Sequence, residues 1–326
     1  MKMEYSAKLL EQVNAAIAAM KYPAEPVGLY EPIRYVLSMG GKRIRPVFLL
    51  LAYNMYRNDI DLVMNAALGL ETYHNYTLLH DDLMDRAAMR RGMPTVHKKW
   101  NSNTAILSGD SMLVMAAKLI LSVVSPVSRE IMELFVQTAL FIGEGQQYDM
   151  NFELRTDVTE DEYIEMIRLK TSVLVACAVK MGAMLGGGVT EDVEALYKFG
   201  EKVGLAFQLQ DDYLDVYGNA AIFGKRIGGD IICNKKTFLL ISAYHNANEV
   251  QQKDLMDWLS RREFDETEKI KSVTNIYDHL GIGKLCIDRI NKYFEEACTC
   301  LSSVKLPEDR KELLWNFAAS LINRKY

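Results

Sequence analysis

Proline is scarce in this chain of 326 residues, and its scarcity favours one class of fold. Only seven prolines occur, and none lies between Pro126 and Pro307. A stretch of that length without proline, rich in Ala, Leu, Met, Glu and Lys, favours helices. Segments in which Val, Ile or Thr alternate with polar residues between turn signals, which are typical of strands, are hard to find.

Cysteine is also sparse, with five residues scattered along the chain. The odd number argues against a disulfide framework. Cys298 and Cys300 lack the usual zinc spacing and have no neighbouring histidine. We therefore expect reduced thiols, as in a cytoplasmic protein.

Long apolar runs and excess positive charge are missing as well. The nearest approach to a membrane span, Ile106–Val124, is interrupted by Asp110 and Lys118, and the first residues contain no apolar signal core. The net charge is −5, which is not typical of a nucleic-acid-binding protein. We expect a cytoplasmic protein with no membrane span and no nucleic-acid partner.

What is present is helical periodicity between regular breaks. Apolar residues recur at helical spacing at Leu9, Val13, Ile17 and Met20. Thr159 and Glu162 have the spacing of a capping box. Breaks are predicted at 21–32, 39–45, 92–94, 154–157, 186–190, 218–230 and Pro307. With no linker-like segment, the sequence predicts a single all-α domain over residues 1–326, a bundle of ten or more helices.

Two aspartate clusters of identical spacing stand about 130 residues apart, at Asp81-Asp82-x-x-Asp85 and Asp211-Asp212-x-x-Asp215. On a helix the first and last aspartates share a face and repel each other. Carboxylates without clustered Cys or His are hard oxygen ligands that suit Mg²⁺, which commonly bridges protein carboxylates to phosphate oxygens. The clusters therefore predict a phosphate or diphosphate ligand.

Basic residues stand next to glycines at several places. Gly40-Gly41-Lys42-Arg43-Ile44-Arg45-Pro46 and Arg90-Arg91-Gly92 place cations in turns, and arginine suits bidentate phosphate contacts. Further cations stand at Lys170, Lys225 and Lys235-Lys236.

Two other kinds of site can be compared with this pattern. Residues 218–226 are one residue too long for a P-loop and lack its Ser or Thr. Glu71-x-x-His74 has the ligand form of a di-iron bundle, but that fold needs a second such pair, and no other histidine has a glutamate three residues before it.

Taken together, the motifs resemble the trans-isoprenyl diphosphate synthases, or polyprenyl synthetases. They are GGKRIRP (40–46), HNYTLLHDDLMDRAAMRRG (74–92), KT (170–171), FQLQDDYLD (207–215) and GGDIICNKKT (228–237). The resemblance implies an all-α bundle around a deep central cavity, usually as a homodimer.

The resemblance also implies roles for single residues. Three Mg²⁺ ions per site would be held by Asp81 and Asp85 with Asp82 nearby, and by Asp211 with Asp215 in support. Isopentenyl diphosphate would be bound by Lys42, Arg45, His74 and Arg91. The allylic diphosphate (dimethylallyl, geranyl or farnesyl) would be bound by Arg90, Lys170, Lys225 and Lys235. Thr171 and Gln208 would line the reaction site.

The resemblance implies ionisation, condensation and elimination, for which no protein nucleophile is needed. The chain departs from the family at Asn234, where glycine is frequent, and at Phe238-Leu239, where proline often follows the threonine. These departures leave open whether Lys235 or Lys236 contacts diphosphate. The basic end Arg324-Lys325-Tyr326 could cover the isopentenyl site.

Product length is expected to depend on the helix before the first cluster. Thr77 lies one turn back from Asp81, Tyr76 lies to its side, and Tyr73 lies two turns back. In the family, bulk here limits chain growth, so Tyr76 predicts C15–C20 products; the alternative is that Tyr73 and Tyr76 are only core aromatics.

Alternative functions are a longer-chain synthase, a terpene cyclase, a head-to-head synthase, and a non-catalytic subunit of a heteromeric synthase. The cyclase and the head-to-head synthase have no need of the GGKRIRP site, and inactive subunits typically lose one aspartate cluster.

Overall fold

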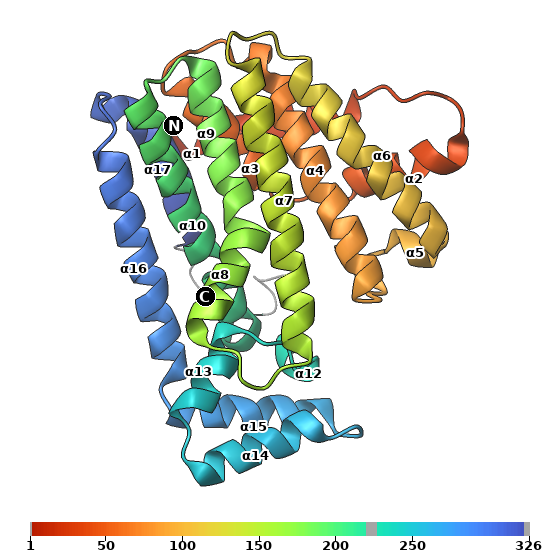
Figure 1. The fold of residues 1–326 in the computed structure, drawn as a ribbon, viewed down its shortest axis with the longest axis vertical. Helices are drawn as coiled ribbons and strands as arrows, with labels where there is room; N and C mark the ends of the chain where they lie inside the picture. Colours follow the sequence, from red (N-terminus) through yellow and green to blue (C-terminus); the bar gives the residue numbers. More distant parts are fainter. Residues whose placement is uncertain (1, 220–226, 323–326) are drawn as a thin grey trace. The chain divides into compact units, whose positions relative to one another are not determined.

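The computed structural model describes residues 2–219 and 227–322, and in this range the chain is helical nearly throughout (Figure 1). The helices of the first part are α1 (Lys2–Ala18), α2 (Val27–Ser38), α3 (Ile44–Asn54), the 3₁₀ segment η1 (Ile60–Val63), α4 (Met64–Met84), α5 (Val96–Lys99), α6 (Ser102–Leu121) and α7 (Ser128–Glu153). They are followed by α8 (Glu160–Ile167), the π-helical segment η2 (Arg168–Ser172), α9 (Val173–Gly186) and α10 (Thr190–Tyr217). The last are α12 (Gly229–Ile232), α13 (Phe238–Asn246), α14 (Glu249–Ser260), α15 (Glu266–His279), α16 (Ile282–Ser302) and α17 (Glu308–Ile322).

Strand structure in the described residues is limited to one hairpin. β1 (Met89–Arg90) pairs antiparallel with β2 (Met93–Pro94). The all-α fold class predicted from the sequence is confirmed.

The chain divides into two compact units. Unit 1 comprises Met1–Val136, Cys177–Tyr197 and Val304–Phe317, and unit 2 comprises Gln137–Ala176, Lys198–Ser303 and Ala318–Tyr326. The first aspartate cluster belongs to unit 1 and the second to unit 2, so each is described within its own unit. The single domain predicted from the sequence stays a prediction.

The core of unit 1 is built on α3, α4 and α6. Every residue of α3 from Pro46 to Tyr53 is buried. Helices α4 and α6 run side by side (Figure 1), and they approach closely at Gly69, where a Cβ would lie 2.7 Å from a side-chain carbon of Ile120. The glycine therefore allows the helix carrying the first aspartate cluster to pack tightly at its first half.

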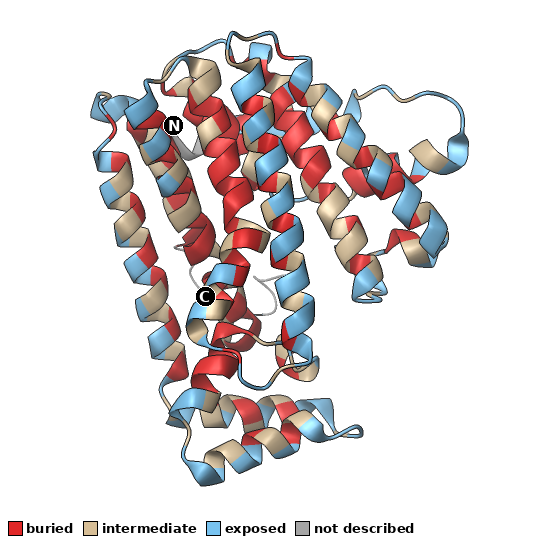
Figure 2. Ribbon diagram, in the orientation of Figure 1, coloured by how far each residue is buried: buried red, intermediate tan, exposed pale blue. Residues whose placement is uncertain are grey.

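The core of unit 2 is formed by apolar faces of α8, α10, α13, α15 and α16. On α16 the buried residues recur at intervals of three or four, which gives the helix one buried and one exposed face (Figure 2). They are Ile282, Cys286, Ile290, Tyr293, Ala297 and Leu301.

Two predicted helix boundaries can be checked. The capping box is confirmed, because Glu162 N–H donates to Thr159 Oγ1 (3.2 Å) and Thr159 N–H donates to Glu162 Oε2 (2.9 Å). The predicted break from residue 21 to Pro32 was wrong at its end, since α2 begins at Val27 and contains Pro32. Pro32 has no N–H to donate to a helical hydrogen bond. Burial of Pro32 and Ile33 in the core offsets the loss of that bond.

Within the described residues, two helical stretches are long and apolar enough to cross a membrane by length and composition alone. They are Ser102–Leu121, of which a third of the most apolar window is buried inside the protein, and Glu160–Gly186, of which two thirds is buried. A buried core helix has the same composition, so the stretches are weak indicators of a membrane span.

Candidate active site

The first aspartate cluster ends α4. Asp81 and Asp82 lie in its last turn, and Asp85 is the residue that follows the helix. The N–H of Asp85 donates to the carbonyl of Asp81 (2.9 Å), so the helical spacing continues to Asp85. Asp85 is exposed and Asp81 is partly exposed, whereas Asp82 is buried. The shared face predicted for Asp81 and Asp85 is the accessible one.

Asp82 faces an arginine instead. Arg90 donates from Nε to Asp82 Oδ2 (2.8 Å), and its Nη2 lies 3.7 Å from Asp81 Oδ2. Burial raises the pKa of Asp82 and the neighbouring Arg90 opposes the rise. Arg90 is thus held by the very cluster it follows in sequence, with Asp82 as its main partner.

The hard oxygen donors of this cluster fit a Mg²⁺ ion. Asp81 and Asp85 present carboxylates on one face, and Asp82 Oδ1 is buried with no hydrogen-bond partner in the described residues. Among these residues no three carboxylate, imidazole or thiolate groups gather into a complete metal-binding set. Mg²⁺ usually completes its shell with water and substrate oxygens, so a partial set of carboxylates is what such an ion requires of the protein.

The first basic turn, Gly40–Pro46, contains three residues with positive φ: Gly40 (75°), Gly41 (137°) and Arg43 (46°). Arg91 lies across this turn and donates from Nη1 to the carbonyl of Gly40. A Cβ on Gly41 would lie 2.9 Å from the Arg91 guanidinium carbon. The bare Cα of Gly41 therefore makes room for Arg91, a residue about 50 positions away in sequence.

Arg91 reaches the turn because of the hairpin that carries it. Arg91 and Gly92 form the two-residue loop between β1 and β2 with φ of 52° and 74°, which is the sign pattern of a type I′ turn. The residues predicted for isopentenyl diphosphate, Arg91 and the GGKRIRP turn, are thus brought together within unit 1.

Arg43 supports the first basic turn from inside. It is 3% exposed and donates to Glu71 Oε1 (2.7 Å), the Leu37 carbonyl (2.7 Å) and Asn14 Oδ1 (3.1 Å). The three acceptors come from α4, α2 and α1, so Arg43 joins these helices at the start of α3. Glu71, the residue of the Glu-x-x-His pattern, is therefore the buried partner of Arg43.

His74, one turn after Glu71, lies among arginines. Arg45 Nη1 is 3.0 Å from His74 Nε2. Burial lowers the pKa of His74 well below its usual value, and Arg45, Arg91, Arg90 and Arg43 lower it further. The imidazole is therefore neutral, and it marks a region of positive potential suited to an anion.

The residues predicted to set product length lie further back on α4. Tyr73 is buried against Phe135, with ring centres 5.2 Å apart. Tyr76 is only partly buried, and its ring lies 4.8 Å from that of His80. Thr77 Oγ1 donates to the His74 carbonyl (2.8 Å). Tyr73 is thus a core aromatic, while Tyr76 is the accessible one of the pair.

The second cluster, in unit 2, lies within the last turns of α10. Asp211 is partly exposed, whereas Asp212 and Asp215 are buried. Asp212 accepts from Tyr163 Oη and from Gln208 Nε2 (3.0 Å). Burial, with the nearby Asp230 charge, raises the pKa of Asp212 to about 7. The middle aspartate is buried in both clusters.

Asp215 fixes the backbone rather than facing outward. Its Oδ2 accepts from the N–H of Asp230 (2.9 Å), and its carbonyl accepts from the N–H of Gly228 (2.6 Å). These contacts anchor the start of α12, and the metal-supporting role of Asp215 stays a prediction.

Thr171 and Gln208, both predicted to line the reaction site, are in contact: Thr171 Oγ1 donates to Gln208 Oε1 (3.1 Å). Lys170 donates to Asp149 Oδ2 (2.6 Å). Both Lys170 and Thr171 lie in the π-helical segment η2, a widened turn that is frequent at functional sites. Gly145 on α7 permits this packing, because a Cβ there would collide with the Lys170 backbone.

The second basic turn, Gly228–Thr237, contains the predicted Lys235. Asn234 N–H donates to the Ile231 carbonyl (3.2 Å), and Lys235 N–H donates to the Asp230 carbonyl (2.9 Å), with Asn234 at φ 55°. This is the Schellman arrangement that ends a helix, and its left-handed position favours glycine first and asparagine second. The departure at Asn234 therefore keeps the conformation that a glycine would provide.

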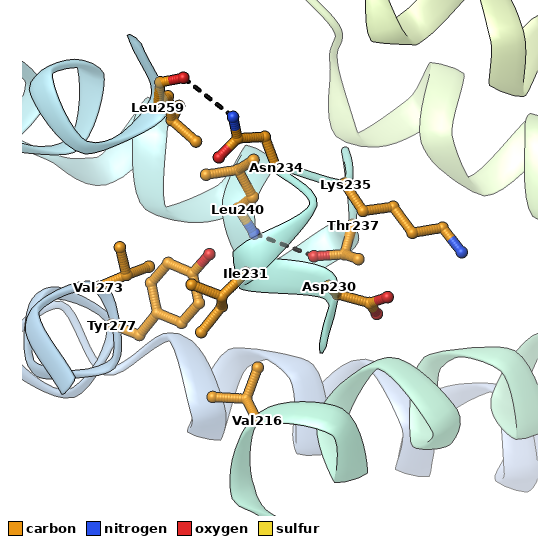
Figure 3. A pocket seen from close by; sticks show the side chains of 10 residues that line it. All are labelled: Val216, Asp230, Ile231, Asn234, Lys235, Thr237, Leu240, Leu259, Val273 and Tyr277. Atoms are coloured by element: carbon orange, nitrogen blue, oxygen red, sulfur yellow. Dashed lines mark hydrogen bonds between the residues drawn. The ribbon is translucent and has the colours of Figure 1, made fainter. Parts of the chain in front are cut away.

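The choice between the two lysines can be addressed from the same turn. Lys235 is exposed, and its charge acts on Asp212 to lower the pKa of that carboxyl against the effect of burial. Figure 3 shows Asp230 and Lys235 extending to the same side of the turn, away from Val273 and Tyr277. Lys236 is half-buried, and burial lowers its pKa. The geometry favours Lys235 as the residue beside the second cluster.

Three residues of this region carry no assignment in the sequence analysis: Asp149, Tyr163 and Asp230. Asp230 stands within the GGDIICNKKT motif and so had a sequence signal. Asp149 stands between exposed residues of α7 and had none. Tyr163 had none. Lys225 and the basic residues 324–326 lie outside the described residues.

Comparisons with known proteins agree with this arrangement of motifs. Residues 26–277 match the model of the polyprenyl synthetase family. The chain is 38% identical to a geranylgeranyl diphosphate synthase of Methanosarcina mazei over 320 residues, covering 96% of this chain and 95% of that protein. It is also 38% identical to a geranylfarnesyl diphosphate synthase of Natronomonas pharaonis, covering 74% and 76%.

A solved structure gives the same result. A crystal structure of a geranylgeranyl pyrophosphate synthase matches with a TM-score of 0.91 and 40% identity, covering 100% of this chain and 99% of that one. The family resemblance read from the motifs is thereby confirmed, and the chain belongs to the polyprenyl synthetase family.

Proposed function

We propose that this chain condenses isopentenyl diphosphate head-to-tail with an allylic diphosphate, giving a trans-polyprenyl diphosphate of C15–C20 and free diphosphate. As a polyprenyl synthetase the chain is a trans-prenyltransferase. The observation that carries the proposal is in unit 1, where the accessible carboxylates of Asp81 and Asp85 stand beside the arginines that surround a neutral His74.

Enzymes of this family generally depend on metal ions, and we propose Mg²⁺, three ions per site. Asp81 and Asp85 would hold ions directly, with Asp211 as the main ligand of the second cluster. Mg²⁺ supplies charge stabilisation for the departing diphosphate. Asp82 and Asp215 would act mainly by holding Arg90 and the start of α12.

The cations divide between the two substrates. Lys42, Arg45, His74 and Arg91 would bind isopentenyl diphosphate. Arg91 lies across the first basic turn, and Arg45 of that turn contacts His74. Arg90, Lys170, Lys225 and Lys235 would bind the allylic diphosphate. Thr171 and Gln208 would orient that substrate through their mutual hydrogen bond.

The chemistry follows from stabilising a leaving group and protecting a cation. Cations around the allylic diphosphate favour breaking of its C–O bond. The isopentenyl double bond attacks the resulting allylic cation, and the condensed cation loses a proton to form the new double bond. Water would quench the cation, so apolar surroundings are required. The leaving diphosphate is a suitable proton acceptor.

The experiment that tests this proposal measures diphosphate release by the purified chain with both substrates and Mg²⁺. Asp81→Ala and Asp211→Ala should each lower turnover by at least a thousandfold while far-UV circular dichroism stays unchanged. A rate near wild type in either variant would refute the metal role of that residue. Activity only in the presence of a second protein would favour the non-catalytic subunit.

Product length tests the role of Tyr76 separately. With isopentenyl and farnesyl diphosphates the wild type should give C20, and Tyr76→Ala should lengthen the product because the ring is accessible. Tyr73→Ala, by contrast, should destabilise the fold, because Tyr73 is buried. Products of C30 or longer from the wild type would instead favour the longer-chain synthase.

We also propose a homodimer formed through α6. Leu107, Val114 and Leu121 are 61%, 67% and 57% exposed and are spaced seven residues apart, which gives α6 an apolar outer stripe. In the dimer, the stripe on α6 of one copy would pack against the same stripe of the second copy. Light scattering should show a dimer for wild type and monomer for Val114→Glu, with Val250→Glu, an equally exposed valine on α14, as the control.

A further inference from the structure

Lys269 is a buried cation outside every motif of the family resemblance. It lies on α15 with none of its surface exposed. Its Nζ donates to Asn234 Oδ1 (2.6 Å) and to the Ile232 carbonyl (3.2 Å), and it lies 4.1 Å from the centre of the Phe264 ring. It forms no ion pair with a carboxylate in the described part of the chain. Burying an ammonium group without a carboxylate partner costs free energy. The three contacts of Lys269 offset this cost.

Both hydrogen bonds are directed at the end of α12. The Ile232 carbonyl is at the last residue of that helix, where a positive charge is favourable. Asn234 stands at the left-handed position of the turn that follows. Both polar atoms of its side-chain amide are hydrogen-bonded. Oδ1 accepts from Lys269, and Nδ2 donates to the Leu259 carbonyl (2.9 Å), as the dashed line in Figure 3 shows. The side chain of Asn234 is thereby fixed between α14 and α15.

The residue after Asn234 is Lys235. Its N–H is held by the Asp230 carbonyl, and its side chain leaves the turn on the side where Asp230 extends (Figure 3). A rotation of the peptide at residue 234 would redirect the Lys235 side chain away from the side of the turn where Asp230 extends. A glycine at 234 could adopt the same φ but would offer nothing for α14 and α15 to hold.

We propose that Lys269, acting through Asn234, is a positioning residue for Lys235 and so for binding and ionisation of the allylic diphosphate, an inference that rests on the proposed function. In this chain the conformational freedom of a glycine is replaced by an asparagine that is clamped by a remote buried lysine. Lys269 itself does not touch substrate.

The test is a kinetic double-mutant cycle between Lys269 and Lys235. Lys269→Met removes the ammonium and keeps a similar length. It should lower kcat/KM for the allylic diphosphate about tenfold or more, because small displacements of a binding group are costly in rate. The KM for isopentenyl diphosphate should change less than twofold. In a Lys235→Met background, Lys269→Met should have little further effect, since its partner in function is already gone.

Controls separate positioning from stability. Lys271→Met removes an exposed lysine from the same helix and should leave both constants unchanged. If Lys269→Met does not fold, Asn234→Gly keeps the backbone conformation, removes the contact with Lys269 and should show the same split between the two substrates. The double variant Asn234→Gly/Lys269→Met should be no worse than either single variant.

The results that would overturn the inference are distinct from those that would overturn the function. An inactive wild type would refute the proposed function. An active wild type in which the Lys269 and Lys235 effects simply multiply, or in which Lys269→Met affects both substrates equally, would refute the positioning role alone.

Discussion

The two basic turns, Gly40–Pro46 in unit 1 and Gly228–Thr237 in unit 2, present cations in similar ways but are supported differently. Each contains an L-residue in the left-handed region, Arg43 in the first and Asn234 in the second. In the first turn the support is Arg43 itself, which pairs with the buried carboxylate Glu71. In the second the support is Lys269, which comes from 35 positions further along the chain and uses neutral acceptors.

The difference shows how a buried cation can be compensated. The fork of Arg43 satisfies three acceptors on three helices, so the first turn is fixed by a charge pair within the core. The single ammonium of Lys269 relies on an amide, a carbonyl and an aromatic ring. Removing a partner should therefore cost more at the first turn than at the second, and four predictions follow this order.

The largest effect is expected for Glu71→Ala. It leaves the Arg43 guanidinium buried without its carboxylate, which should cost about 3–5 kcal/mol of unfolding free energy. Urea denaturation measures the loss. Glu133→Ala, which breaks an exposed pair with Arg129, is the control and should change the value by less than about 0.5 kcal/mol. Equal losses of unfolding free energy in both variants would mean that the buried Arg43–Glu71 pair stabilises the fold no more than an exposed pair does.

Asn234→Ala should cost less, on the order of 2 kcal/mol. The alanine is strained at positive φ, and Lys269 Nζ loses an acceptor. Asn234→Gly relieves the strain and should lose a smaller amount in the same denaturation experiment. Equal stability of the alanine and glycine variants would contradict the strain expected for an alanine in the left-handed conformation at residue 234.

Gly41→Ala should weaken binding as well as folding, because an alanine at φ 137° is strained. The added methyl meets the Arg91 guanidinium, so Arg91 must move away from the first basic turn. The KM for isopentenyl diphosphate should rise about tenfold, equivalent to about 1.4 kcal/mol. Gly28→Ala, at a position where a Cβ meets no atom, should leave the KM unchanged. An unchanged KM in Gly41→Ala would mean that Arg91 does not bind isopentenyl diphosphate.

The smallest effect is on the pH dependence of stability, and it concerns His74, which contacts Arg45 of the first basic turn. The pKa of His74 is lowered in the folded protein, so the unfolded chain binds a proton below about pH 6.5 that the folded protein does not. The free energy of unfolding that depends on a neutral His74 is therefore fully present at pH 7.5 and falls as the pH drops below about 6.5. His74→Gln should lose this part of the pH dependence, as measured by unfolding above and below that pH.

Much of the fold was predictable because helices depend on local properties. The lack of proline, the apolar spacing and the Thr159 capping box act within a few residues, and all three gave helices where they were expected. The break at Pro32 was misplaced because burial of the α2 residues around it outweighs the loss of one backbone hydrogen bond.

The site divides in the same way. That Asp81 and Asp85 share one face follows from helix geometry alone. That Asp82 and Asp212 are buried does not, because it depends on Arg90 and Tyr163, which stand 8 and 49 residues away.

By itself, the sequence determined the helical class, the two aspartate clusters, the two basic turns and the family to which they belong. Only the tertiary structure showed that Arg43 and Lys269 are buried and hydrogen-bonded at the two turns, that Gly41 accommodates Arg91, and that Lys235 is exposed whereas Lys236 is half-buried. The physical reason is that periodicity and turn chemistry are written in neighbouring residues. The partner of a buried charge is chosen by the packing of distant helices, which no local pattern encodes.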